Sequence, residues 1–241
     1  MGWVQSEVFL LHSSSKVAII LKQFANTMIT LIKLRQPEFT LSVRGEHKVT
    51  MDAVSTVKEL NKKYDIILLG LKAPDLMAMV NDIKPLIKEN TLLVAMQNGI
   101  IEDQLDEAFG KKHVCGCIVG WGGTMHADKR VEMTSTGEFI IGNLDNRPDD
   151  RLPTLKKILE SAAPTRISSN FIGDRYSKLI INSCITALGA ICGLYLGEML
   201  SSKKSRTIFL EIIKEAVDVA NAMGIKIEPF NGKLDYYKIA G

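Results

Sequence analysis

Short apolar runs alternate with amphipathic stretches through the first two thirds of the chain. Four of the runs predict β-strands, over residues 16–20, 38–43, 65–71 and 91–96. These runs are apolar on both faces, which is typical of strands in a parallel sheet that helices cover on each side. We therefore expect an α/β layer structure in this part of the chain.

Helical patterns lie between these strands. Residues 21–36 mix apolar and polar positions, and residues 74–90 repeat apolar side chains at helical spacing. Alternation of strand and helix implies right-handed crossovers and a Rossmann-like, doubly wound sheet. The pattern further predicts three strands and then a helix, over residues 113–121, 129–133, 138–142 and 151–162.

The character of the sequence changes near residue 168. From there the pattern predicts long helices, over 174–199 and from about 202 to 223, with Gly224 as a stop after the second. Gly189, Gly193 and Gly197 recur every four residues, which indicates close packing. We expect two domains: a Rossmann-like α/β domain over 1–168, and an all-helical domain over 169–241.

Composition narrows the class of protein. The chain has 241 residues, 46% of them hydrophobic and 24% charged, which is ordinary for a globular protein. A net charge of +3 without a basic stripe argues against nucleic acid as a partner. No stretch predicts a signal peptide or a membrane span, and four cysteines are too few for a secreted disulfide framework. We expect a cytoplasmic protein.

Polar residues follow two of the predicted strands where each strand ends. Lys72 follows the strand over 65–71, and Gln97-Asn98-Gly99 follows the strand over 91–96. Ligands of open α/β sheets bind outside the carboxyl ends of the strands, so Lys72 is a candidate for a phosphate contact. A solvated loop lysine and an ordinary Asn-Gly turn are the alternative interpretation.

The stretch RYSKLIINSCITAL, residues 175–188, is an apolar helical pattern that carries an ammonium group and an amide. Lys178 and Asn182 are four residues apart, and so lie on one face of a helix. A desolvated lysine there suits a general acid. By periodicity alone, a lysine that extends into solvent explains the pattern as well.

Other catalytic and metal-binding classes have little support. His113, Cys115 and Cys117 point to one face of a strand, where they cannot readily enclose a zinc ion, and no fourth ligand pairs with them. We therefore expect no metal site. The sequence contains neither the G-x-S-x-G motif of serine hydrolases nor a Walker A motif.

Six segments stand in a characteristic order over about residues 38–228: SVRGEH, DIILLGLKAPDL, MQNGI, TSTGEFIIG, RYSKLIINSCITAL and EAVDVANAMGI. In this order they resemble the ketopantoate reductase (2-dehydropantoate 2-reductase) family. The resemblance implies that the Rossmann-type domain over 1–168 binds the NADP dinucleotide. It implies that the helical domain over 169–241, which is incomplete, serves substrate binding and dimerisation. It also implies NADPH-dependent reduction of a small 2-oxo acid, 2-dehydropantoate, on the route to pantothenate and coenzyme A.

The resemblance assigns substrate-side roles to four residues. The match to Lys178 is the general acid that protonates the ketone oxygen as hydride arrives. The match to Asn98 touches cofactor and substrate near the reacting carbon, and the match to Asn182 holds the polar end of the substrate. Thr186 occupies a further substrate-binding position, at which the family usually carries Asn.

Three residues receive cofactor roles by the same resemblance. Arg44 and Lys72 flank the adenosine 2′-phosphate, which implies NADPH over NADH, and Glu102 is a candidate partner for a cofactor ribose.

The sequence departs from the family at both ends. The glycine positions of the G-x-G-x-x-G turn carry Leu21, Gln23 and Asn26, although those glycines allow the close approach of the pyrophosphate. The family's later S-x-x-x-D and G-R-x-T-E pattern is absent. Two hypotheses therefore stand: an NADPH-dependent reductase that can form a homodimer, or an inactive relative that acts as a binding or scaffold module.

Overall fold

The computed structural model describes residues 17–21, 38–42, 46–50, 57–60, 62–125, 130–230 and 232–241. The chain divides into two compact units, Met1–Ile167 and Ser168–Gly241. The predicted helix over 21–36 lies outside the described residues.

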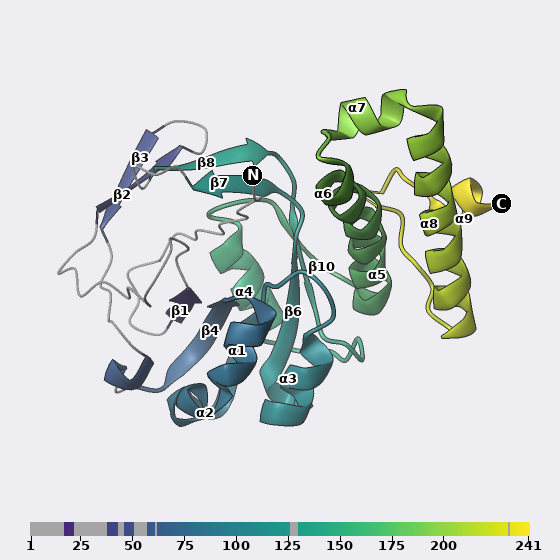
Figure 1. Cartoon of the computed structure of the whole chain (residues 1–241). Helices are drawn as coiled ribbons and strands as arrows, with labels where there is room; N and C mark the ends of the chain where they lie inside the picture. Colours follow the sequence, from purple (N-terminus) through teal and green to yellow (C-terminus); the bar gives the residue numbers. More distant parts are fainter. Residues whose placement is uncertain are drawn as a thin grey trace. The chain divides into compact units, whose positions relative to one another are not determined.

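A six-stranded sheet forms the centre of the first unit (Figure 1). Neighbouring strands run parallel except for one antiparallel pair, β6 with β9. The strands, in their order across the sheet, are β1 (Val17–Leu21), β4 (Tyr64–Gly70), β5 (Ile87–Ala95), β6 (Val114–Val119), β9 (Phe139–Gly142) and β10 (Thr165–Ile167).

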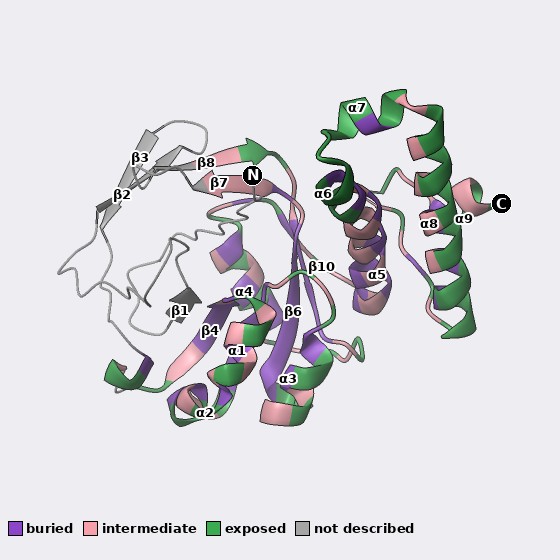
Figure 2. Ribbon diagram, in the orientation of Figure 1, coloured by how far each residue is buried: buried purple, intermediate pink, exposed green. Residues whose placement is uncertain are grey.

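The central strands of this sheet are buried on both faces. Ile66 and Leu68 of β4 belong to one apolar cluster, while Ile67 and Leu69 belong to a second cluster on the opposite face. Helix α4 (Leu152–Leu159) supplies apolar side chains to the first cluster. Three helices, α1 (Ala73–Ala78), α2 (Val80–Ile83) and α3 (Glu102–Phe109), supply them to the second. The buried ribbons of Figure 2 follow this arrangement, which confirms the predicted doubly covered α/β sheet.

A second, four-stranded sheet corrects the predicted place of two strands. β2 (Glu38–Ser42) and β8 (Arg130–Ser135) pair with each other, in a sheet of order β3-β2-β8-β7 that includes β3 (Glu46–Thr50) and β7 (Gly122–Met125). The predicted strands 38–43 and 129–133 therefore exist, but they lie outside the main sheet. Hydrophobic patterning predicts a strand and leaves its partner open.

The helix predicted over 74–90 is wrong beyond residue 83. Helix α2 ends at Ile83, a 3₁₀ turn covers Lys84–Leu86, and β5 begins at Ile87. Pro85 explains the break, because its ring has no N–H to donate and clashes with the preceding helical turn.

The second unit is helical but more broken than predicted. α5 (Phe171–Ile181) continues through a π-helical turn (Asn182–Ala187) into α6 (Leu188–Cys192). The predicted single helix over 174–199 then stops at Gly193, which has a φ of 66° and ends α6 in the left-handed conformation. The short helix α7 (Leu196–Ser201) follows. Gly193 is thus a helix stop. A side chain at Gly193 or Gly197 would meet no atom within 4 Å, so the packing role predicted for these two glycines is wrong, whereas Gly189 lies close to Met199.

The long helix α8 (Lys203–Ala222) matches the prediction closely, and Gly224 follows it at a φ of 70°. Its buried residues Ile213, Val217 and Ala220 pack with Ile180 and with Tyr236 of the last helix, α9 (Tyr236–Ala240). Among the described residues, no helix has the length and the apolar character needed to cross a membrane.

Within the first unit, Arg151 joins the loop before α4 to the turn before β6. Arg151 donates to both carboxylate oxygens of Asp149, at 2.8 and 2.6 Å, and to the carbonyl oxygen of Lys112 at 2.6 Å. The Asp149 side chain is only 6% exposed. Burial would raise the pKa of Asp149, but the hydrogen bonds and charge of Arg151 hold that pKa below its ordinary value.

We expect Arg151→Met to lower the free energy of unfolding by about 2 kcal/mol, because the buried carboxylate of Asp149 loses its charged partner. The pKa of Asp149 is lowered in the folded state, so this contribution is present above the unfolded value, about 4, and is lost as the pH falls through the folded value. Urea unfolding of wild type and variant should therefore converge as the pH falls below about 4.

Arg147→Met is the matched control. Arg147 pairs with Asp145, whose side chain is 46% exposed. That variant should lose clearly less stability than Arg151→Met. Equal losses at pH 7, or a difference that does not change with pH, would contradict the role given to Arg151.

Candidate functional site

Lys72 lies at the carboxyl end of β4, where the chain turns into α1. Leu71 is buried and Lys72 is exposed, and Lys72 occupies the N-cap position of the helix. Pro74 falls within the first turn, where its missing N–H disturbs no helical hydrogen bond. The sequence therefore folds so that an ammonium group stands at the edge of the sheet where α/β proteins bind ligands.

Asn98 lies at the same edge, one strand along. β4 and β5 are parallel neighbours, with Leu69 opposite Ala95, so the loops that follow them are adjacent. Asn98 is exposed, and Gly99 has a φ of 100°, a backbone conformation that favours glycine. The turn leads into α3, whose first residue is Glu102, which is buried. A carboxylate in the first turn is favoured by the helix dipole.

Gln97 links these two strand ends, a contact that the sequence alone did not reveal. Its Nε2 donates to the carbonyl oxygens of Leu69 at 2.6 Å and Leu71 at 2.8 Å. The backbone N–H of Met96 also donates to Leu69, at 3.3 Å. In the sequence, Gln97 is one polar residue of a turn, and no pattern marks its side chain as a tie between strands.

Three predicted residues belong to the second unit. Lys178 lies in the last turn of α5 and is half-buried, as is Asn182 at the start of the π-helical turn. Thr186 lies within that turn and is exposed. π-helical turns are rare and occur frequently at functional sites.

Two hydrogen bonds stabilise α5, the helix that carries Lys178. The Tyr236 hydroxyl donates to the carbonyl oxygen of Ser177 at 2.7 Å. Burial raises the pKa of that phenol, so the hydroxyl keeps the proton that it donates. At the start of α5, the side-chain oxygen of Asn170 accepts from the Gly173 N–H at 3.2 Å. The first contact joins α5 to α9, and the second caps the N-terminus of α5.

Three of the positions singled out in the sequence lie outside the described residues, namely Arg44, Gln23 and Asn26. The structure thus places Lys72, Asn98 and Glu102 along one sheet edge of the first unit, and Lys178, Asn182 and Thr186 along one helical run of the second.

The cysteines of β6 are part of the hydrophobic core. Cys115 and Cys117 are buried in the apolar cluster that α4 covers, and burial raises the pKa of Cys115 to about 12. Its thiol is therefore neutral near pH 7 and is a poor metal ligand. His113 is buried as well, with Nδ1 2.9 Å from the carbonyl oxygen of Thr91. Among the described residues, no cluster of His, Cys, Asp or Glu could hold a metal ion.

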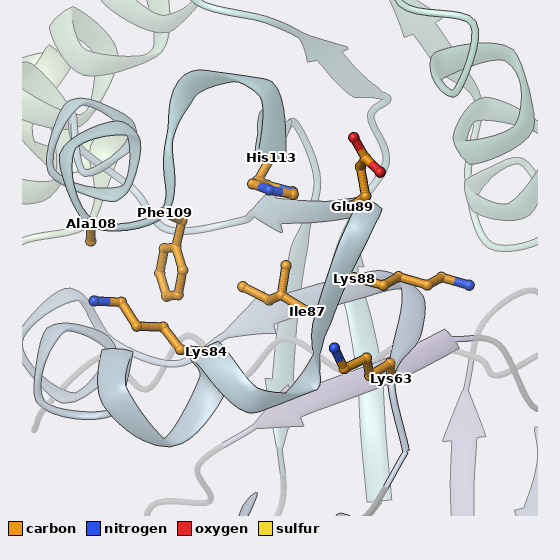
Figure 3. A pocket seen from close by; sticks show the side chains of 8 residues that line it. All are labelled: Lys63, Lys84, Ile87, Lys88, Glu89, Ala108, Phe109 and His113. Atoms are coloured by element: carbon orange, nitrogen blue, oxygen red, sulfur yellow. The ribbon is translucent and has the colours of Figure 1, made fainter.

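A shallow pocket of about 320 Å³ lies at the opposite edge of the main sheet (Figure 3). It is found where β4, β5 and β6 begin, so it is separate from the edge that carries Lys72 and Asn98. Its lining combines three apolar side chains with three lysines, a histidine and a glutamate. The lining residues are Lys63, Lys84, Ile87, Lys88, Glu89, Ala108, Phe109 and His113. Lys88 is neutralised by an ion pair with Asp65.

Two family models match the chain. The model described as "Ketopantoate reductase PanE/ApbA" matches residues 13–146, and "Ketopantoate reductase PanE/ApbA C terminal" matches residues 170–238. Curated relatives named 2-dehydropantoate 2-reductase include one from Pyrococcus horikoshii, 24% identical over 189 residues, and one from Lactococcus lactis, 25% identical over 188. The alignments cover 78% and 76% of this chain, but only 62% and 60% of the relatives.

Solved structures share the fold. A PanE/ApbA family ketopantoate reductase from Ralstonia eutropha JMP134 has a TM-score of 0.70 at 25% identity, over 84% of this chain and 66% of its own. D-mandelate dehydrogenase, solved with NADH and anilino(oxo)acetate, has a TM-score of 0.69 at 22% identity, over 84% and 64%. A dimeric ketopantoate reductase from Staphylococcus aureus also scores 0.69, at 16% identity, over 93% and 77%.

The two family models follow one another along the chain, and the first alone covers more than half of it. The Rossmann-like unit and the helical unit correspond to these two models in order. The chain spans about three fifths of the length of the curated relatives that it matches. From its sequence and its fold, this chain belongs to the ketopantoate reductase family.

Proposed function

We propose that this protein is an NADPH-dependent reductase of a 2-oxo acid, with 2-dehydropantoate as the substrate and pantoate as the product. The observation that carries the proposal is the family match across both units, together with polar residues at the sheet edge where such folds bind dinucleotides. An inactive binding module has less support, because the curated relatives are named as reductases.

The described residues fit a nicotinamide dinucleotide, which would supply the hydride. Lys72 offers an exposed cation at the carboxyl end of β4, suited to a phosphate. Asn98 offers an exposed amide at the end of β5, and Glu102 offers a carboxylate that can accept from a ribose hydroxyl. With Arg44, Lys72 forms the proposed contact to the 2′-phosphate, which is why we propose NADPH and not NADH.

The second unit supplies the proposed proton and the substrate contacts. Reduction of a ketone adds a hydride to the carbonyl carbon and a proton to the carbonyl oxygen. Lys178 is the proposed proton donor, because an ammonium group carries a proton that it can transfer to the developing alkoxide. Asn182 and Thr186 lie further along the same helical run and are proposed to hold the polar end of the substrate by hydrogen bonds.

We also propose a homodimer, formed through the second unit. Of the twelve large apolar side chains that are exposed in the described part of the chain, ten lie in this unit. Five of them gather on the segment that runs from α6 to α7: Ile191, Leu194, Tyr195, Leu196 and Leu200. Apolar surface of this kind marks interaction sites. A second copy is the occupant that we favour, because one relative of the same fold is described as dimeric.

All four cysteines are free, and three of them are buried. Free thiols suit a reducing compartment, so we propose a cytoplasmic location.

For the cofactor, we expect micromolar binding of NADPH, with NADH at least about tenfold weaker, because a 2′-phosphate contact contributes about 1.5–3 kcal/mol. Lys72→Met should reduce this preference while changing the affinity for NADH little. Calorimetric titration with both nucleotides measures it. Lys62→Met, at the opposite end of β4, is the matched control and should bind like wild type. A preference that survives in Lys72→Met would remove this role.

For catalysis, Lys178→Met should lower kcat for 2-dehydropantoate about 10²–10⁴-fold, while the dissociation constant for NADPH stays within about twofold of wild type. The lysine acts in the transition state, so its loss appears in kcat. Lys204→Met, an exposed lysine of α8, is the control. Unchanged turnover in Lys178→Met would refute the acid role, and a wild-type protein that binds NADPH but reduces no 2-oxo acid would refute the proposed reaction.

For assembly, we expect wild type to sediment as a dimer, and Ile191→Asp to weaken association at least about tenfold, because a buried charge without a partner opposes the interface. Ile191 is 83% exposed within the chain, so the variant should keep its thermal stability as a monomer. Ile100→Asp, at an exposed apolar position of the first unit, should leave sedimentation unchanged. A monomeric wild-type protein would contradict the proposal.

A further inference from the structure

The side-chain amide of Gln97 has an unambiguous orientation. Both of its near neighbours, the carbonyl oxygens of Leu69 and Leu71, can only accept hydrogen bonds. The nitrogen must therefore face them, at 2.6 and 2.8 Å, and both of its N–H groups are used. Exchange of the oxygen and nitrogen would place three acceptors together, which excludes the flipped orientation.

The oxygen of the same amide is not satisfied. Gln97 Oε1 is buried, and no described residue donates a hydrogen bond to it. A buried acceptor without a donor is destabilising, and such groups are uncommon in native proteins. A purely structural tie needs the N–H groups alone, so the oxygen is the part of this side chain that the fold does not explain.

The location indicates what could use the oxygen. Gln97 directly precedes Asn98, at the carboxyl ends of the neighbouring parallel strands β4 and β5. It fastens the loop that carries Lys72 to the turn that carries Asn98, and both residues are proposed cofactor contacts. The nicotinamide riboside half of a dinucleotide offers two kinds of donor, the N–H groups of the carboxamide and the hydroxyls of the ribose.

We infer that Gln97 is a cofactor-binding residue, whose Oε1 accepts a hydrogen bond from a donor on the nicotinamide riboside half of the dinucleotide. The inference rests on the proposed function, because it requires that a dinucleotide binds at this edge. The two polar atoms of the Gln97 amide thus have different roles. Nε2 holds the ends of β4 and β5 together, and Oε1 contacts the ligand.

Two substitutions separate these tasks. Gln97→Met removes both the donors and the acceptor with little change in volume. Gln97→Lys keeps donors that can reach the carbonyl oxygens of Leu69 and Leu71, but it has no acceptor. Gln104→Met changes an exposed glutamine of α3 and is the matched control. Thermal unfolding of each variant establishes that the fold is intact.

The ligands are NADPH and its 3-acetylpyridine analogue, in which a methyl group replaces the NH₂ of the carboxamide. Calorimetry gives the dissociation constant of each. If the carboxamide is the donor, wild type and Gln104→Met should prefer NADPH over the analogue by about tenfold, the value of one hydrogen bond. In Gln97→Met and Gln97→Lys this ratio should fall to near one. A merely structural role would weaken both ligands in Gln97→Met alone, because Gln97→Lys keeps the tie, and it would leave the ratio unchanged.

The other outcomes are equally decisive. If a ribose hydroxyl is the donor, Gln97→Met weakens the binding of both ligands about equally. Gln97→Lys then weakens the binding of both as well, although it keeps the tie to Leu69 and Leu71. This outcome supports the inference and identifies the ribose as the donor. If Gln97→Lys binds both ligands like wild type, the acceptor role is refuted. If wild type binds neither ligand, the proposed function and the inference both fail, whereas intact wild-type binding with unaffected variants overturns the inference alone.

Discussion

The structure of the first unit depends on one constraint, which is that its central strands are buried on both faces. Ile67, Leu68, Leu92 and Leu93 are each at most 2% exposed, and along each strand they face alternately into the two apolar clusters. A strand in this position has no room for a polar side chain without a partner. Polar side chains that contact a ligand are therefore found after the strands end. Lys72 and Asn98 are exposed, and they lie within a few residues of the ends of β4 and β5.

The same constraint made much of the fold predictable. A continuous apolar run identifies a strand such as β4, and the helical spacing of Ile213, Val217 and Ala220 identifies α8. The predictions failed where a single residue overrides a pattern. Pro85 ends a helix that the apolar spacing continues, and Gly193 ends another by adopting a positive φ. Both residues were visible in the sequence, but the strength of the surrounding pattern concealed their effect.

Partner choice was less predictable than element type. The strand over 38–42 pairs with β3 and β8 in a second sheet and not with the strands of the main sheet. Pairing depends on contacts between distant segments, which no local pattern records. The Gln97 tie has the same origin, since a side chain that donates to backbone carbonyls 26 and 28 residues away leaves no local mark.

The candidate site shows how far spacing arguments reach. Lys178 and Asn182 are four residues apart across the last turn of α5, so α-helical periodicity places them on one face. Thr186 is four residues further on, but it lies in a turn whose backbone hydrogen bonds span five residues and not four. Each residue of such a turn rotates the chain by less than an α-helical residue does, so the direction of Thr186 cannot be taken from the α-helical rule. The pairing of Lys178 with Asn182 therefore has a physical basis in the sequence, whereas the role of Thr186 depends on the family resemblance alone.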